Sequence, residues 1–307
     1  MSTKWPIIAL IITMVVSLPS CNSCKRSDDP SRAFNVPDSL MQDKPLPIAK
    51  PVMDEMMQNI ASPLETAALM KALKVPFDKN LLTPTKVAEK FNTSFDKALA
   101  LGIYGCDLGY INMYEKTSFV VDYITHIKRI ADDIQVGQFF DFSTLKRLAT
   151  NSENLDSIIF IAQQNFNRMD TYFKETNRSI LSAVMVAGTW AEGMFLTTKV
   201  AELTNHPKIR ETLGEQKAVL GYLMALLKVY ENSDPNMAAL IADFEDIRQR
   251  YSNVTITYEH GEPEMVEVNG ELTWVQNDKQ TIHMEDSDYR EIIASIQAFR
   301  NKLAKLN

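Results

Sequence analysis

The sequence predicts a mainly α-helical protein, built as a multi-helix bundle or an irregular helical stack with a small β hairpin near the C-terminus. Three observations support this fold class. Apolar residues recur at helical spacing through much of the chain from about residue 52 to 250. Glycine is scarce, with 10 in 307 residues, which disfavours a loop-rich all-β fold. Near the C-terminus, alternating β-branched runs flank an Asn-Gly pair.

The first segment of the chain has the three parts of a secretory signal peptide. Lys4 supplies a positive charge, and the apolar run over 7–18 is too short to cross a hydrocarbon core of about 30 Å as a helix. Residues 18–21 have the sequence Leu-Pro-Ser-Cys, which matches a lipobox. We therefore predict a lipoprotein signal peptide over 1–20 and acyl chains, such as palmitate, on Cys21. Ordinary signal cleavage and an uncleaved anchor are the alternatives.

Residues 21–51 are predicted to form a flexible tether. They hold five prolines among Ser, Asp and Lys residues, so this segment cannot bury enough apolar surface to fold alone. Asn22, in place of Asp, is typical of lipoproteins that Gram-negative bacteria sort to the outer membrane. Ser27-Asp28-Asp29 is similar to the signal that sends lipoproteins of Bacteroidota to the outer face. We expect a lipid-anchored protein of the cell envelope, at the outer membrane.

Residues 52–307 are predicted to form the helical domain. Ser62-Pro63 and Thr83-Pro84 each place a capping residue before a proline, which is a helix-start signal. One long helix is expected over 99–134. Helical spacing of apolar residues, together with helix start and stop signals, predicts the other helices at 153–175, 178–203, 207–231, 235–250 and 286–305.

A β segment is predicted at about 254–284, between the last two helices. Residues 254–258 alternate and are rich in β-branched side chains. The alternating runs 265–268 and 272–275 flank Asn269-Gly270. An Asn-Gly pair between two such runs is a strong signal for a tight hairpin.

Three of the predicted helical stretches are apolar on nearly every side, at 98–114, 180–198 and 218–230. Such helices are buried in a large core or in a membrane. The stretch at 180–198 is long enough to span a membrane, but a carboxylate at the bilayer centre costs about 2.5–3.5 kcal/mol on insertion scales. Because Glu192 lies in this stretch, we expect a central helix of the domain instead.

Small residues in the first of these stretches are expected to let another backbone approach closely. They are Gly102, Gly105 and Gly109. Each glycine costs about 1 kcal/mol relative to alanine within a helix, which close packing would offset.

The apolar stretches or their ends also contain three acidic residues, Asp107, Glu115 and Glu192. A buried carboxylate is costly unless it is paired or hydrogen-bonded. In a structural interpretation, each acid accepts hydrogen bonds from a helix N-terminus, from Tyr104, Tyr110 or Trp190, or from Arg178 or Lys199. In a functional interpretation, the acids meet in a pocket and bind a cation or a polar ligand. The candidate pocket comprises Asp107, Glu115, Trp190 and Glu192.

Other candidate chemistry is sparse. Asp122 and His126 share a helix face at i, i+4, which suits either a solvated pair or one edge of a metal site. The chain has no Cys/His spacing for zinc, no phosphate-binding loop, no dinucleotide fingerprint and no nucleophile elbow. We therefore predict no metal and no cofactor. The net charge of −7 argues against nucleic acid as a partner.

Two motifs in the apolar helices resemble a known family. They are Gly102-Ile103-Tyr104-Gly105-Cys106-Asp107-Leu108 and Gly188-Thr189-Trp190-Ala191-Glu192-Gly193. Together with the lipobox, they resemble an uncharacterised family of helical envelope lipoproteins of Bacteroidota. The resemblance covers most of the mature helical region. This chain has Cys106 where a small residue such as alanine is expected. The resemblance supplies no catalytic residues, but it implies that Asp107, Trp190 and Glu192 belong to a shared core or pocket.

These observations lead to three hypotheses about function. The first is a non-enzymatic lipoprotein of the outer membrane whose helical domain binds a ligand or an envelope protein partner, or serves as a scaffold. Its contact with the membrane is the lipid on Cys21. The second is a helical hydrolase or metal-dependent enzyme that uses the buried carboxylates. The third is a structural spacer without a ligand.

Overall fold

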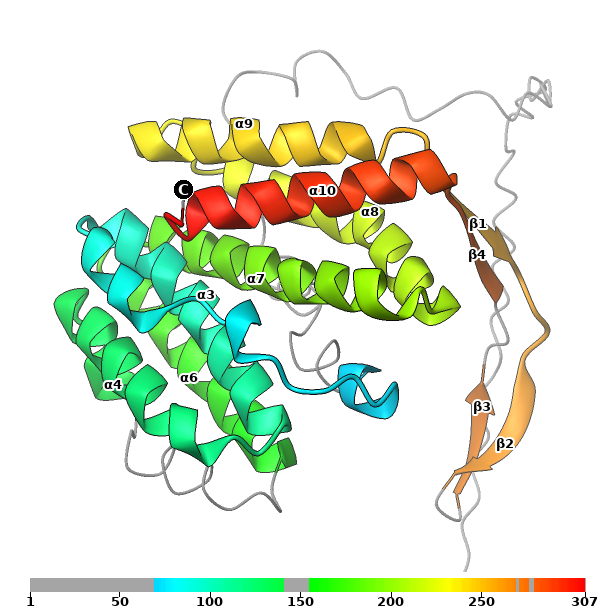
Figure 1. Cartoon of the computed structure of the whole chain (residues 1–307), viewed down its shortest axis with the longest axis horizontal. Helices are drawn as coiled ribbons and strands as arrows, with labels where there is room; N and C mark the ends of the chain where they lie inside the picture. The colour runs from blue at the N-terminus through cyan, green and yellow to red at the C-terminus, as the bar shows by residue number, and fades with distance from the viewer. Residues whose placement is uncertain (1–68, 141–154, 269–270, 276–278, 307) are drawn as a thin grey trace, which may run out of the picture. The chain divides into compact units, whose positions relative to one another are not determined.

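A computed structural model describes residues 69–140, 155–268, 271–275 and 279–306, all of them within one unit that covers residues 45–307. The fold is mainly α-helical with a β ribbon before the last helix, which confirms the predicted fold class (Figure 1). The predicted signal peptide, the tether with Cys21 and the helix start at Ser62-Pro63 lie outside the described residues.

Two helices replace the single long helix expected over 99–134. α3 (Ser94–Met113) begins at a capping box, in which the Thr93 side chain accepts the Asp96 N–H and the Asp96 side chain accepts the Thr93 N–H. α4 (Thr117–Asp133) follows after a short turn. The break occurs at Glu115, whose φ of 56° lies in the left-handed region.

The turn between α3 and α4 is a Schellman motif. The Glu115 N–H donates to the Asn112 carbonyl, and the Lys116 N–H donates to the Ile111 carbonyl, both at 3.0 Å. Glycine or asparagine usually occupies the left-handed position of this motif. The glutamate at this position explains why the sequence pattern did not indicate a helix end.

The remaining α-helices lie close to their predicted ranges. They are α6 (Leu155–Glu175), α7 (Ile180–Thr204), α8 (Pro207–Lys228), α9 (Pro235–Arg250) and α10 (Asp286–Leu303). The prolines that begin α8 and α9 follow His206 and Asp234, whose side chains cap the first turn.

Residues 69–72 are also helical, and the described part of the chain contains three short 3₁₀ helices. They are η2 (Lys79–Leu81), η3 (Thr85–Lys90) and η4 (Gly137–Phe139). The Thr83-Pro84 signal thus precedes a 3₁₀ helix rather than an α-helix. Pro84 is the N-cap of η3, and Thr83 is buried and engaged in tertiary hydrogen bonds. We refer to residues 79–90, which contain η2 and η3, as the strap.

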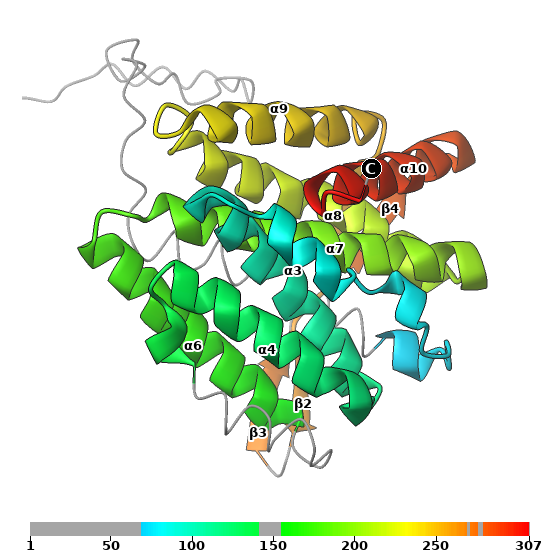
Figure 2. The same cartoon turned by 60° about the vertical axis from the view of Figure 1, so that its left-hand side comes forward.

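Helix α7 lies at the centre of the helical domain, in contact with α3, α6, α8 and α10 (Figures 1 and 2). Among the described residues it is the one helix long and apolar enough to cross a membrane, and 89% of its apolar window is buried inside the protein. Burial among these neighbouring helices accounts for its apolar composition on all sides.

The close contact between α3 and α7 depends on one glycine in each helix. A Cβ atom on Gly102 would lie 2.0 Å from the Met185 carbonyl oxygen, and one on Gly188 would lie 2.3 Å from the Leu99 carbonyl oxygen. Either methyl group would therefore push the two backbones apart. Gly102 fulfils the predicted role, whereas Gly105 is exposed with open space around it, so the prediction for Gly105 was wrong.

The predicted hairpin is the outer half of a longer β ribbon. β2 (Glu264–Val268) and β3 (Glu271–Val275) pair antiparallel, and Val268 is opposite Glu271. β1 (Thr255–Glu259) and β4 (Lys279–His283) form a second antiparallel pair, which the sequence did not resolve into separate strands.

Helix α8 holds the inner half of this ribbon. The Ile282 side chain of β4 occupies the space that a side chain on Gly214 would need, because a Cβ there would lie 2.4 Å from Ile282 Cγ2. The Gln280 amide donates to Glu215 at 3.1 Å, and Lys217 Nζ donates to the Val254 carbonyl at the start of the ribbon. One face of α8 thus fixes the ribbon at its base.

Candidate functional site

Asp107 on α3 and Glu192 on α7 lie close together at the contact between these helices. Both side chains are completely buried, and both bind Thr83 of the strap. The Thr83 N–H donates to Asp107 Oδ2 at 3.0 Å, and the Thr83 hydroxyl donates to Glu192 Oε2 at 3.4 Å. The structure therefore brings together two of the four residues of the candidate pocket.

Arg300 on α10 completes this cluster. Its guanidinium binds both carboxylate oxygens of Glu192, with Nε to Oε2 and Nη2 to Oε1 each at 2.7 Å. Nη2 also donates to the Thr83 hydroxyl at 2.8 Å and to the Leu81 carbonyl at 3.1 Å. The guanidinium carbon lies 4.0 Å from the centre of the Phe195 ring, which adds a cation–π contact.

Arg300 is only 3% exposed, so this ion pair is shielded from water. A buried guanidinium depends on its counter-charge, since an unpaired buried charge is strongly unfavourable. Burial acts to lower the pKa of Arg300, but the charge and hydrogen bonds of Glu192 raise that pKa above its ordinary value. Arg300 and Glu192 therefore form a buried, bidentate ion pair.

Asp107 is the acid in excess, because the cluster contains two carboxyl groups and one guanidinium. Its Oδ1 is buried and has no hydrogen-bond partner among the described residues. Burial, followed by the negative charge of Glu192, raises the pKa of Asp107 well above its ordinary value. This shift favours the protonated form of Asp107, which would balance the charge of the cluster.

Tyrosine hydroxyls from α3 and α4 hold the strap over this cluster. Tyr123 donates to the Thr83 carbonyl at 2.7 Å, and Tyr104 donates to the Pro84 carbonyl at 3.0 Å. Burial and the nearby Asp107 raise the pKa of both phenols, so both stay protonated as donors. Every polar group of the strap named here therefore has a partner in the helical domain.

Glu115 does not join this cluster, which corrects its place in the candidate pocket. It occupies the left-handed position at the end of α3, and its exposed carboxylate pairs with Lys71 Nζ at 3.3 Å. An exposed pair of this kind contributes little to stability. The pattern suggested burial because the apolar run continues through Tyr114, whereas the helix ends before Glu115 can face the core.

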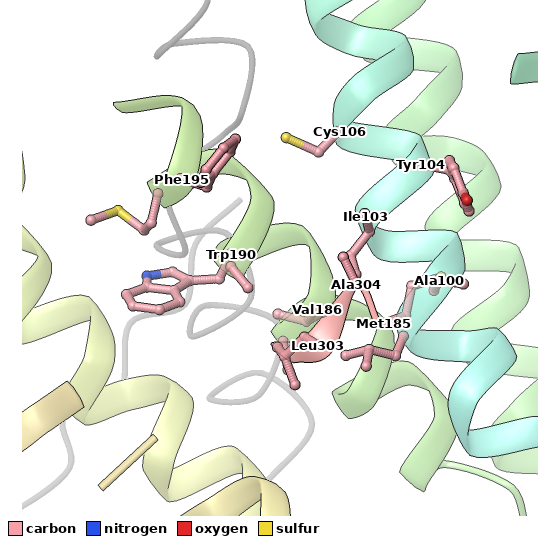
Figure 3. Close-up of a cluster of buried hydrophobic side chains, with 14 of the residues drawn as sticks. Ala100, Ile103, Tyr104, Cys106, Met185, Val186, Trp190, Phe195, Leu303 and Ala304 are labelled. Carbon is pink, nitrogen blue, oxygen red and sulfur yellow. The ribbon is translucent and has the colours of Figure 1, made fainter. Parts of the chain in front are cut away.

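Trp190 is also separate from the cluster. It is buried, but its ring points away from α3 (Figure 3). The indole Nε1–H donates to Gln216 on α8 at 3.0 Å, and the ring packs 5.4 Å from the Phe244 ring of α9. Trp190 and Glu192 are two positions apart on α7, so they face different neighbours.

The remaining candidate residues show no convergence on a metal site. His126 Nδ1 lies 3.4 Å from Asp122 Oδ1 on the surface of α4, and Asp122 also accepts a hydrogen bond from Thr85. In the described part of the chain, no three His, Cys, Asp or Glu side chains are grouped so that they could hold a metal ion. Cys106 is a free, buried thiol whose pKa is raised by burial, and its side chain points from α3 toward α7 (Figure 3).

Sequence reasoning missed Arg300, although the sequence contained a signal for it. The buried residues Ile296 and Leu303 lie four positions before and three positions after Arg300. These spacings place Arg300 on the apolar face of its helix. An arginine on such a face requires a buried acid as its counter-charge. Asp107 and Glu192 were the buried acids for which the sequence indicated no single ion-pair partner.

Chemically, the cluster links the strap to α3, α7 and α10 by hydrogen bonds and an ion pair. Apart from Asp107 Oδ1, the charged and polar groups named here are bound by other parts of the chain, and Asp107, Glu192 and Thr83 are all completely buried. Comparisons with known proteins found no matching family model, and no significant match among curated proteins or solved structures.

Proposed function

We propose that this chain is a lipoprotein of the bacterial cell envelope, anchored at the outer membrane by acyl chains on Cys21, and that its helical domain binds or supports an envelope partner without catalysis. One observation carries the proposal: the lipobox at 18–21 directly follows a short apolar run. A single acyl chain binds a membrane only marginally, whereas two or more anchor a protein stably. Lipidation of Cys21 would therefore determine where the domain acts.

The roles of the acidic residues support a binding or scaffold domain over the enzyme hypothesis. A catalytic acid or nucleophile has to reach its substrate. Glu192 is instead bound by Arg300, and Asp107 is covered by the strap. Glu115, which the enzyme hypothesis also requires, lies on the surface at the end of α3.

The anchor is tested by comparing Cys21→Ser with Cys24→Ser, a matched control three residues further along. Cells expressing each variant are labelled with radioactive palmitate and separated into soluble and membrane fractions. We expect Cys21→Ser to lose both the label and the membrane association, and Cys24→Ser to keep both. Labelled, membrane-bound Cys21→Ser protein would contradict the proposed anchor.

The outer-membrane location is tested separately by density-gradient separation of the inner and outer membranes. We expect the native chain in the outer-membrane fraction. The segment Ser27-Asp28-Asp29 is tested by adding protease to intact cells, with Asp28→Ala and Asp29→Ala combined in the variant. Cleavage of the native chain but not of this variant would support a surface-directing role, and equal cleavage would argue against it.

A further inference from the structure

The outer half of the β ribbon presents two large apolar side chains to solvent. Met265 of β2 and Trp274 of β3 are directly opposite each other in the register, so both lie on the same face. Met265 is 48% exposed and Trp274 is 65% exposed. By contrast, Trp190 in the core is 1% exposed. A large, exposed aromatic side chain beside a second apolar residue is typical of binding surfaces.

The inner half of the ribbon explains how this face is held in position. α8 binds β4 through Ile282 and Gln280, whereas β2 and β3 make their main contacts with each other. In Figure 1, β2 and β3 lie at the end of the ribbon farther from α8. The helical domain therefore fixes the base of the ribbon and leaves the Met265–Trp274 face uncovered among the described residues.

The charge of the ribbon limits what can cover this face. Residues 255–283 contain six acidic residues and a single lysine, so the ribbon accounts for most of the chain's net charge of −7. A second copy of the ribbon would bring like charges together, which is unfavourable. An anionic lipid surface would repel the ribbon for the same reason.

We propose that the β ribbon, Thr255–His283, docks onto a basic protein surface of an envelope partner, with Trp274 inserted into an apolar socket that lysine or arginine residues surround. This inference rests on the proposed binding function and names the chemistry of its partner. Opposite charges steer the encounter, and burial of the tryptophan supplies the affinity. The excess of acidic residues in the sequence of the ribbon favours a cationic partner.

The test uses the mature chain with Cys21→Ser, so its outcome does not depend on lipid anchoring. The probe is a short peptide of alternating lysine and valine, and the control peptide alternates glutamate and valine. Binding is followed by fluorescence, since the mature chain has two tryptophans and only Trp274 is exposed. We expect saturable binding of the lysine peptide, weakened by added salt, and no binding of the glutamate peptide.

Three variants locate the binding. Trp274→Ala should weaken binding of the lysine peptide by about tenfold or more, measured by calorimetry. Tyr222→Ala, an exposed aromatic residue on α8, is the matched control and should bind as the native chain does. Because Trp274→Ala could disturb the hairpin, the variant Glu267→Gln removes a charge at the position two residues after Met265, on the same face of β2, without altering the apolar pair. It should lower the affinity severalfold and reduce the salt dependence.

Several results would overturn the proposal. They include equal binding of the two peptides, no saturable binding of either, and unchanged affinity in both the Trp274→Ala and the Glu267→Gln variants. A blue shift of Trp274 fluorescence on phosphatidylcholine vesicles, without a response to the lysine peptide, would assign the face to lipid. A dimer in sedimentation that Trp274→Ala dissociates would assign it to self-association.

Discussion

Replacing Asp107 with asparagine tests the charge balance of the buried cluster. Asp107 and Glu192 are both completely buried, and they share one guanidinium, that of Arg300. Burial and the charge of Glu192 hold the pKa of Asp107 well above its ordinary value. In the unfolded chain, an aspartate carboxyl titrates near pH ~4. Above that pH the unfolded state releases a proton that the folded state retains.

The sign and size of the effect follow from this difference in proton binding. The contribution of Asp107 to stability is fully present below about pH 4 and is lost as the pH rises toward the folded pKa. One proton corresponds to about 1.4 kcal/mol for each pH unit. Asparagine has no such proton, and its amide oxygen can still accept the Thr83 N–H. The unfolding free energy of Asp107→Asn minus that of the native chain should therefore rise with pH, by up to about 1.4 kcal/mol per unit.

The measurement is urea unfolding of the mature chain, followed by circular dichroism at a series of pH values between about 4 and 7. Asp96→Asn is a control that should show little pH dependence in this range. Burial acts to raise the pKa of Asp96, but Lys305 and backbone donors lower it overall, so the stability it supplies is lost only as the pH falls below about 4. A difference for Asp107→Asn that decreases toward neutral pH would show that Asp107 is ionised and would refute the inferred proton.

Two further pairs of variants test the packing and the ion pair by the same unfolding assay. Gly102→Ala should destabilise the domain by about 1–3 kcal/mol because its Cβ would meet the Met185 carbonyl, whereas Gly105→Ala should stabilise it by about 0.5–1 kcal/mol. Equal effects at the two glycines would contradict the close contact of α3 and α7. Glu192→Gln should lower the free energy of unfolding by about 3–5 kcal/mol, because it leaves a buried guanidinium unpaired. Glu202→Gln removes a surface ion pair on the same helix and should lower it by less than about 1 kcal/mol. A loss below about 1 kcal/mol for Glu192→Gln would refute its role as counter-ion.

The sequence predicted most helices of the domain because their ends carry local signals. The prolines that begin α8 and α9 follow residues that cap the helix, and Asn205 in the left-handed conformation ends α7. The hairpin signal at 269–270 predicted the pairing of β2 with β3. The break between α3 and α4 was missed because Glu115 takes a backbone conformation that glutamate seldom adopts.

The candidate site was predictable only in part, because its members come from distant regions of the chain. Lone acids in apolar helices indicated that Asp107 and Glu192 needed partners. Their partners lie in the strap and in α10, and no local pattern connects these segments. Trp190 was grouped with Glu192 by proximity in sequence, although a difference of two positions in a helix turns the side chains to different sides.

The cluster also connects the beginning of the described domain to its end. The strap follows the N-terminal part of the chain, and Thr83 binds Asp107 of α3, Glu192 of α7 and Arg300 of α10. If the chain is anchored at Cys21 as proposed, a pull on the membrane side reaches the domain from its N-terminal side. The buried residues Met70 and Val75 precede the strap and meet this pull first, and the hydrogen bonds of the strap add contacts with α3, α7 and α10.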